Sequence, residues 1–194
     1  MKPSTSRFAA AASLAISSTA LAQSSIIIDV ADPVLMPGQS TTVTLWAAFP
    51  AREYAMAQVA LDLLTSVDIE SWSHLELLPP MNRPGSTPGS LTSFGIDGIV
   101  AGQINSPVTG ALQDNPIAFW RARYTAPTDV GSSFDVHLST LTSQFDVYIE
   151  SRRPDTRSYL STLTEGQATI HIIPAPAGAV VLGFGVLVAG RRRR

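Results

Sequence analysis

The residues best suited to chemistry are three histidines, His74, His137 and His171, which are scattered along the chain. His137 and His171 alternate with apolar residues, and Asp135 and Asp146 occupy the same side of neighbouring segments. If these segments pair in a sheet, imidazole and carboxylate groups would share one face, as a surface metal site or an acid–base cluster requires. One face of an antiparallel sheet is ordinarily polar and wet, so we favour solvated side chains without a metal.

Other catalytic patterns are missing from the sequence. It contains no Gly-x-Ser-x-Gly, Ser-x-x-Lys or His-Glu-x-x-His context and no dinucleotide fingerprint. The glycine-rich stretch 95–102 does not lead from a strand into a helix, so it is no phosphate loop. Asp29 and Asp32 supply two carboxylates, far short of the six to eight oxygens that calcium takes. We expect no enzyme, cofactor or metal, with a surface hydrolase as an alternative.

Two aromatic residues are candidates for an exposed ligand platform, as a carbohydrate-binding module would need. Trp46 lies on the threonine side of its segment, and Tyr148 lies between Asp146 and Glu150. Packing of Trp46 under a loop or at a sheet edge is the alternative that we favour, because tryptophan is usually largely buried. Trp120 is expected in the core. It shares its predicted face with Ala118, Ala122 and Tyr124.

The elements that would position these residues are strands. Apolar residues recur at every second position, the pattern of half-buried strands, and Pro/Gly-rich turns separate the segments, the longest at residues 79–90. Eight or nine short strands and no convincing long helix predict an all-β, two-sheet antiparallel β-sandwich or jelly roll. The expected strands are residues 25–30, 41–49, 58–65, 75–78, 91–104 (one strand or two), 117–125, 133–141, 145–151 and 167–173.

The layout of these strands resembles that of cohesin-like and carbohydrate-module sandwiches. An N-terminal strand is followed by "PGQSTTVTLWAAF", and the aromatic strand "IAFWRARYTAP" leads into "VGSSFDVHL". The resemblance concerns the fold, because sandwiches of this kind host many functions.

Composition narrows the class of partner. The chain has 194 residues and no cysteine, so it has no disulfide or thiolate site, and its stability depends on a hydrophobic core. Residues 23–173 contain seven arginines against 15 acidic residues, and hence carry a formal charge of −8. A surface of this sign repels nucleic acid, which we exclude as a partner.

The N-terminus is typical of a secretory signal peptide, residues 1–22. Lys2 and Arg7 form the positive region, an apolar stretch follows, and Ala20 and Ala22 flank the small-x-small cleavage position. We expect a signal helix that is cleaved after Ala22.

The C-terminus combines an apolar run with a basic end. Residues 177–190 lack charged side chains and would span about 21 Å as a helix, less than the ~30 Å of a bilayer core. Arg191, Arg192, Arg193 and Arg194 follow, and basic residues after an apolar run halt translocation and stay in the cytoplasm. The pattern predicts a marginal transmembrane helix that resides in the inner membrane transiently.

The same tail, residues 174–194, is similar to the PEP-CTERM sorting signal, which consists of a Pro-x-Pro motif, a short apolar helix and an arginine cluster. Here the motif is Pro174, Ala175 and Pro176, with alanine in place of the glutamate of the family's name. The resemblance implies cleavage by an exosortase-type sorting protease or transpeptidase, and delivery to the cell envelope or exopolysaccharide layer.

The sequence thus predicts a signal peptide (1–22), one sandwich domain (23–173) and a sorting tail (174–194). We expect an exported structural or binding protein that resides in the inner membrane during processing and then in the envelope or extracellular matrix. Its partners would be polysaccharide or another surface protein. The alternatives are a carbohydrate-binding module and, third, the surface hydrolase.

Overall fold

The computed structural model describes residues 23–51, 53–66, 71–103, 113–149 and 155–174. Among these residues no helix is long and apolar enough to cross a membrane. The expected signal peptide with Ala20 and Ala22, and the tail from Ala175 through Pro176 to the four terminal arginines, lie outside the described residues. Pro174 is described and is exposed.

Four strands form the first sheet, in the spatial order β1-β3-β8-β5, and every pairing in it is antiparallel. The expected alternation holds in its second strand, where Val43, Leu45 and Ala47 are buried and Thr42 is exposed. The strands are β1 (Ser25–Val30), β3 (Ser40–Ala48), β8 (Ile117–Thr125) and β5 (Trp72–Leu77).

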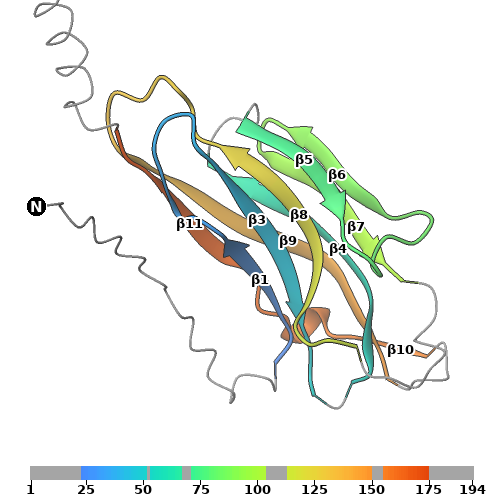
Figure 1. Cartoon of the computed structure of the whole chain (residues 1–194). Coiled ribbons are helices and arrows are strands. Elements are labelled where there is room, and N and C mark those ends of the chain that lie inside the picture. Colours follow the sequence, from blue (N-terminus) through green and yellow to red (C-terminus); the bar gives the residue numbers. More distant parts are fainter. Residues whose placement is uncertain (1–22, 52, 67–70, 104–112, 150–154, 175–194) are drawn as a thin grey trace, which may run out of the picture.

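Seven strands form the second sheet, six of them in the order β2-β11-β9-β4-β7-β6, while β10 pairs with β9. They are β2 (Val34–Leu35), β11 (Gln167–Ile172), β9 (Phe134–Tyr148), β4 (Ala55–Thr65), β7 (Gly95–Gly102), β6 (Thr87–Thr92) and β10 (Thr156–Ser158). A short 3-10 turn, η2 (Leu160–Thr162), follows β10. Figure 1 shows the two sheets stacked, with β1, β3 and β8 in front of β11, β9 and β4. The predicted all-β, two-sheet sandwich is therefore confirmed.

The prediction of two strands at 133–141 and 145–151 is wrong, because β9 runs unbroken from Phe134 to Tyr148. The polar residues between the two segments do not turn. Opposite β4 the register shifts, so that Ala60 faces Gln144 and Leu61 faces Thr142, which leaves Ser143 as an extra residue. Such a bulge keeps the strand continuous while it resets which residues point inward.

Three short pairings correct the expected strand list. The edge strand β6 begins at Thr87, within the stretch 79–90 that we expected to be a loop, while β2 and β10 were not predicted. The pairing of β2 with β11 is parallel, in contrast to the antiparallel pairing expected throughout. These segments carry too few apolar alternations for a period-two pattern to identify them.

The core lies between the two sheets and is built from their inner faces. Its largest fully buried side chains are Trp120, Tyr124, Phe49, Phe119, Phe145, Leu45, Met56, Leu63, Met81, Ile96, Ile99 and Leu138. One polar bond crosses the core: Trp120 Nε1 on β8 donates to the carbonyl oxygen of Pro88 on β6, at 2.9 Å. This bond joins the two sheets at the edge strand.

Candidate functional site

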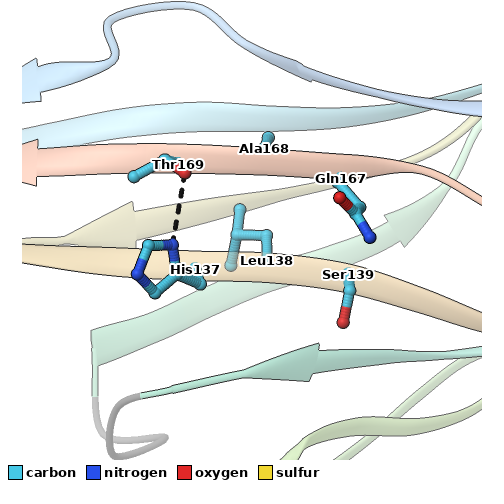
Figure 2. A pocket seen from close by; sticks show the side chains of 6 residues that line it. All are labelled: His137, Leu138, Ser139, Gln167, Ala168 and Thr169. Carbon is cyan, nitrogen blue, oxygen red and sulfur yellow. Dashed lines mark hydrogen bonds between the residues drawn. The ribbon is translucent and has the colours of Figure 1, made fainter.

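The histidines His137 and His171 lie on the outer face of the seven-stranded sheet, where β9 pairs with β11. The register places Asp135 opposite His171 and Thr169 opposite His137. His171 Nδ1 lies 2.7 Å from Asp135 Oδ1. Figure 2 shows the neighbouring contact, in which His137 Nδ1 lies 3.3 Å from Thr169 Oγ1. The two histidines and Asp135 therefore share one face of the sheet, as predicted. They form two neighbouring side-chain contacts, one to Asp135 and one to Thr169.

The outer face around His137 and His171 is open to solvent. A shallow hollow of about 420 Å³ lies along the two strands, lined by His137, Leu138, Ser139, Gln167, Ala168 and Thr169. The side chains of His171 and Asp135 are 52% and 49% exposed, so water screens their attraction and the pair contributes little stability.

The remaining residues of the expected cluster lie elsewhere. Asp146 accepts a hydrogen bond from Gln144 further along β9, and His74 lies on β5 of the other sheet. Within the described ranges, no three His, Cys, Asp or Glu side chains are grouped closely enough to hold a metal ion. Asp29 and Asp32, the residues considered for calcium, are both exposed near the end of β1.

The aromatic candidates differ in their burial. Tyr148 is only 8% exposed and its hydroxyl donates to the carbonyl oxygen of Gln103 at 3.2 Å, so its expected role as an exposed platform is wrong. It packs with Tyr54 in a small satellite core because it closes the end of β9. Trp46 is half-buried on the outer face of the four-stranded sheet.

A bulge in the same sheet explains why Ala118 does not share a face with Trp120, contrary to the prediction. Trp120 is buried as expected, opposite Leu45. The register then shifts so that Trp46 faces Ala118, which leaves Phe119 as the extra residue. Ala118 therefore lies on the outer face beside Trp46, and it does not share the inner face with Trp120.

A surface that the sequence reasoning missed lies on the outer face of β4 and β9. Asp62 lies opposite Leu141 and Leu64 opposite Ser139, so these four residues form a square that we call the leucine face. Leu141 is 55% and Leu64 is 37% exposed. The signal was present, because both leucines fall on the polar side of their alternating strands.

The leucine face continues into further apolar and polar groups. Half-buried Ala60 and Val100 lie opposite each other on β4 and β7. Phe94 in the β6–β7 turn is 74% exposed, and its carbonyl oxygen accepts from the Thr65 N–H next to Leu64. This side of the sheet therefore exposes several apolar groups to water beside Asp62 and Ser139.

A chain of polar side chains borders these apolar groups. Arg83 Nη2 donates to Gln58 Oε1, and Gln58 Nε2 donates to Gln144 Oε1 at 3.1 Å. Gln144 Nε2 then donates to Asp146 Oδ2 at 2.6 Å. Arg83 lies over Gly102, where a Cβ atom would come within 2.8 Å of its Nε. The row fixes a guanidinium and a carboxylate at its two ends.

A buried carboxylate lies at the loop end of the sandwich. Glu53 is 8% exposed and accepts hydrogen bonds from the Tyr159 hydroxyl and, at 3.3 Å, from Arg157 Nη1. The pKa of Tyr159 is raised, first by burial and then by the hydrogen bond to Glu53, which stabilises the protonated hydroxyl. These bonds fasten the segment around η2 to the β3–β4 loop, which is a structural role.

Comparisons with known proteins identify the architecture. No protein-family model matches the sequence, and no curated protein matches it. The seventh ScaB type I cohesin from Pseudobacteroides cellulosolvens matches with a TM-score of 0.53 at 12% identity, over 80% of this chain and 94% of that chain. The domain has the fold of a cohesin module.

Two further structures match less closely. A type I cohesin–dockerin complex from Clostridium thermocellum gives a TM-score of 0.49 at 11% identity, over 78% of this chain and 99% of that chain. The sixth cohesin of Acetivibrio cellulolyticus scaffoldin B, in complex with a dockerin, gives 0.43 at 9% identity, over 79% and 98%. At such identities the likeness concerns the fold alone.

Proposed function

We propose that this chain is an exported, non-catalytic binding module that receives a protein partner on the leucine face. The observation that carries the proposal is the pair Leu64 and Leu141, two large apolar side chains that lie diagonally across β4 and β9 and are open to water. Contiguous exposed apolar surface with a polar border is characteristic of interaction sites. The cohesin-like architecture supports a binding module at the level of the fold.

The chemistry of the face favours a protein over a small substrate. Its two exposed leucines flank Asp62 and Ser139, and the polar side chains from Arg83 to Asp146 lie at its margin. Protein interfaces likewise combine large apolar side chains with a hydrogen-bonding rim. A fitting partner presents apolar side chains to Leu64 and Leu141, an acidic group to Arg83 and a basic group to Asp146.

The partner site can be tested with three matched variants. Leu64→Ser and Leu141→Ser alter the face, whereas Leu160→Ser alters an equally exposed leucine in η2. A specific partner captured from the envelope fraction by the full-length protein should bind Leu160→Ser normally and bind the other two about tenfold more weakly. Equal capture of every partner by all three variants would overturn the proposal.

Placement of the module is the second part of the proposal. Residues 1–22 direct export, residues 177–190 hold the chain in the inner membrane, and an exosortase-type enzyme cleaves near Pro174, Ala175 and Pro176. The domain then reaches the cell envelope or exopolysaccharide matrix. Support comes from the tripartite patterns at both ends of the sequence.

Mass spectrometry of the mature protein tests this placement through both termini at once. We expect an N-terminus at Gln23, created by cleavage after Ala22, and loss of the basic end from Arg191 to Arg194. Full-length protein that retains Met1 and Arg194 in the cytosol would refute export and processing, and would leave the proposal for the leucine face to its own test.

A further inference from the structure

We propose that the opposite side of the molecule, the outer face of the four-stranded sheet, binds a neutral polysaccharide, with Trp46 as the ring on which a sugar stacks. This site is separate from the leucine face and does not depend on it, because the two outer faces lie on different sheets of the sandwich. The proposal concerns the row of residues around Trp46 and a second row next to it, which contains Asp29, Thr44, Arg121 and Glu76.

Trp46 is half-buried on the outer face, so part of its side chain contacts water. The residue lies on β3, with Ile27 of β1 opposite on one side and Ala118 of β8 opposite on the other. All three side chains are half-buried, and they form a short apolar row across the sheet. An aromatic ring in such a row offers a flat apolar surface of the kind that a sugar ring can cover with its C–H groups.

A polar row lies immediately beside the apolar one and crosses all four strands. Asp29 lies opposite Thr44, Thr44 opposite Arg121, and Arg121 opposite Glu76. Arg121 Nε and Glu76 Oε1 form an ion pair whose side chains are 50% and 46% exposed. The row therefore presents carboxylate acceptors, a hydroxyl and guanidinium donors along one line.

The chemistry of these two rows fits a hydroxyl-rich ligand. Hydroxyl groups both donate and accept hydrogen bonds, so they can match Asp29, Thr44 and the Arg121–Glu76 pair alike. A ligand with apolar C–H faces and hydroxyl edges would use the Trp46 row and the polar row together. This combination of one apolar surface and a few placed polar groups is the usual composition of a small-molecule site.

The balance of charge on the face selects a neutral polymer. Asp29 and Glu76 oppose Arg121 and the exposed Arg123, so the face as a whole favours neither sign. An anionic polymer would meet the two carboxylates, and nucleic acid requires a basic surface. A protein partner fits less well here, because charged residues are depleted at the centre of protein interfaces.

Two measurements on the full-length protein test the site with defined probes. Hydroxyethylcellulose and galactomannan are the neutral polymers, and alginate is the anionic control. Native electrophoresis in gels that contain each polymer measures retardation. Acrylamide quenching of tryptophan fluorescence reports mainly on Trp46, because Trp72 and Trp120 are 4% and 0% exposed.

We expect at least one neutral polymer to retard the protein and to reduce quenching, with no retardation by alginate. Trp46→Ala should weaken retardation about tenfold, and Trp46→Phe, which keeps a ring, should restore most of it. Combined Arg121→Gln and Glu76→Gln should weaken it several-fold without touching the ring. Leu141→Ser, on the opposite face, should leave it unchanged.

The proposal is overturned if neither neutral polymer retards the protein, if alginate retards it as strongly as they do, or if Trp46→Ala binds like the wild type. Far-ultraviolet circular dichroism checks that each variant is folded. If Trp46→Ala is unfolded, the doubly substituted Arg121 and Glu76 variant decides, and unchanged retardation of that variant counts against the site.

Discussion

At the scale of single residues, Gly95 shows how closely the backbone packs at the start of β7. Its φ is +142°, and a Cβ atom would come within 2.0 Å of the Leu63 carbonyl oxygen on β4. No rearrangement of a flexible side chain can relieve this contact, because the obstacle is backbone. Glycine is therefore required where the β6–β7 turn meets Leu64, beside the leucine face.

We expect Gly95→Ala to lower the free energy of unfolding by about 2–3 kcal/mol, through backbone strain and displacement of β7 from β4. Gly131→Ala is the control, because no atom lies within 4 Å of its Cβ position. Urea denaturation monitored by circular dichroism measures both variants. Equal stability of the two would show that the backbone at residue 95 accommodates a side chain.

Truncation of the buried Glu53 should cost more folding stability than truncation of the exposed Glu76. Glu53→Ala removes the acceptor of Tyr159 and Arg157 in a buried setting, so we expect a loss of about 2–3 kcal/mol. Glu76→Ala breaks an ion pair that is half-exposed and should cost less than about 1 kcal/mol. Urea denaturation at pH 7 compares them, and a larger loss for Glu76→Ala would contradict the structural role of Glu53.

At the scale of strands, the edge strand β6 makes a side-chain hydrogen bond across the sandwich. It pairs with β7 on one side, and the carbonyl oxygen of Pro88 accepts from Trp120 Nε1 of the other sheet. Proline in an edge strand also removes one donor that another chain could pair with. The backbone ladder with β7 and the Trp120 indole both hold the strand, which also lies beside β5.

Trp120→Phe should loosen β6 selectively. The variant keeps a ring in the core but loses the bond to Pro88, so we expect amide exchange in β6 to accelerate about tenfold. Trp72→Phe is the matched control, because the Trp72 indole N–H has no hydrogen-bond partner among the described residues. Hydrogen exchange followed by mass spectrometry reports on peptides that contain residues 87–92. Similar acceleration in both variants would disprove the specific link.

Alternation along the sequence predicted most of the strands, since β1 and β8 begin and end where expected. It failed where a bulge resets the alternation, because one extra residue such as Ser143 or Phe119 is invisible to a fixed period of two. It failed also for β2 and β10, whose two or three residues pair only because the rest of the fold places them there.

The candidate site could also be predicted only in part. Alternation placed His137, His171 and Asp135 on the outer face, but their contacts also required β9 to pair with β11, which the sequence left as a condition. The burial of Tyr148 did not follow, because it depends on Gln103 and Tyr54 from distant parts of the chain. The leucine face could have been found by asking which large apolar residues fall on the wet side of a strand.

At the scale of the whole molecule, two tyrosines with raised pKa values make the folding stability vary with pH in the alkaline range. Burial raises the pKa of Tyr124 more than the nearby Ser71 hydroxyl lowers it, and the pKa of Tyr159 is raised too. A raised pKa in the folded state means that the folded protein holds its proton more tightly than the unfolded chain. The resulting stabilisation is complete below about pH 10 and is lost as the pH rises through the folded-state values.

Tyr124→Phe should reduce this dependence. We expect wild-type stability to fall steadily above about pH 10, and the variant to lose less over the same range, because one of the two protons is no longer linked to folding. Guanidinium denaturation at pH 8, 9, 10 and 11 measures the slope. Identical slopes for both proteins would exclude Tyr124 as a contributor, and a rise in stability with pH would contradict the sign.

The parallel contact between β2 and β11 has a mechanical consequence. Strand β11 ends at Ile172, two residues before the last described residue, Pro174, and it is bonded to β2 on one side and to β9 on the other. Tension on a tethered C-terminus would run along β11, while its hydrogen bonds lie across that direction. Those bonds would be loaded together in shear, so a domain pulled through its C-terminal end should resist the extraction of β11 far better than one peeled open strand by strand.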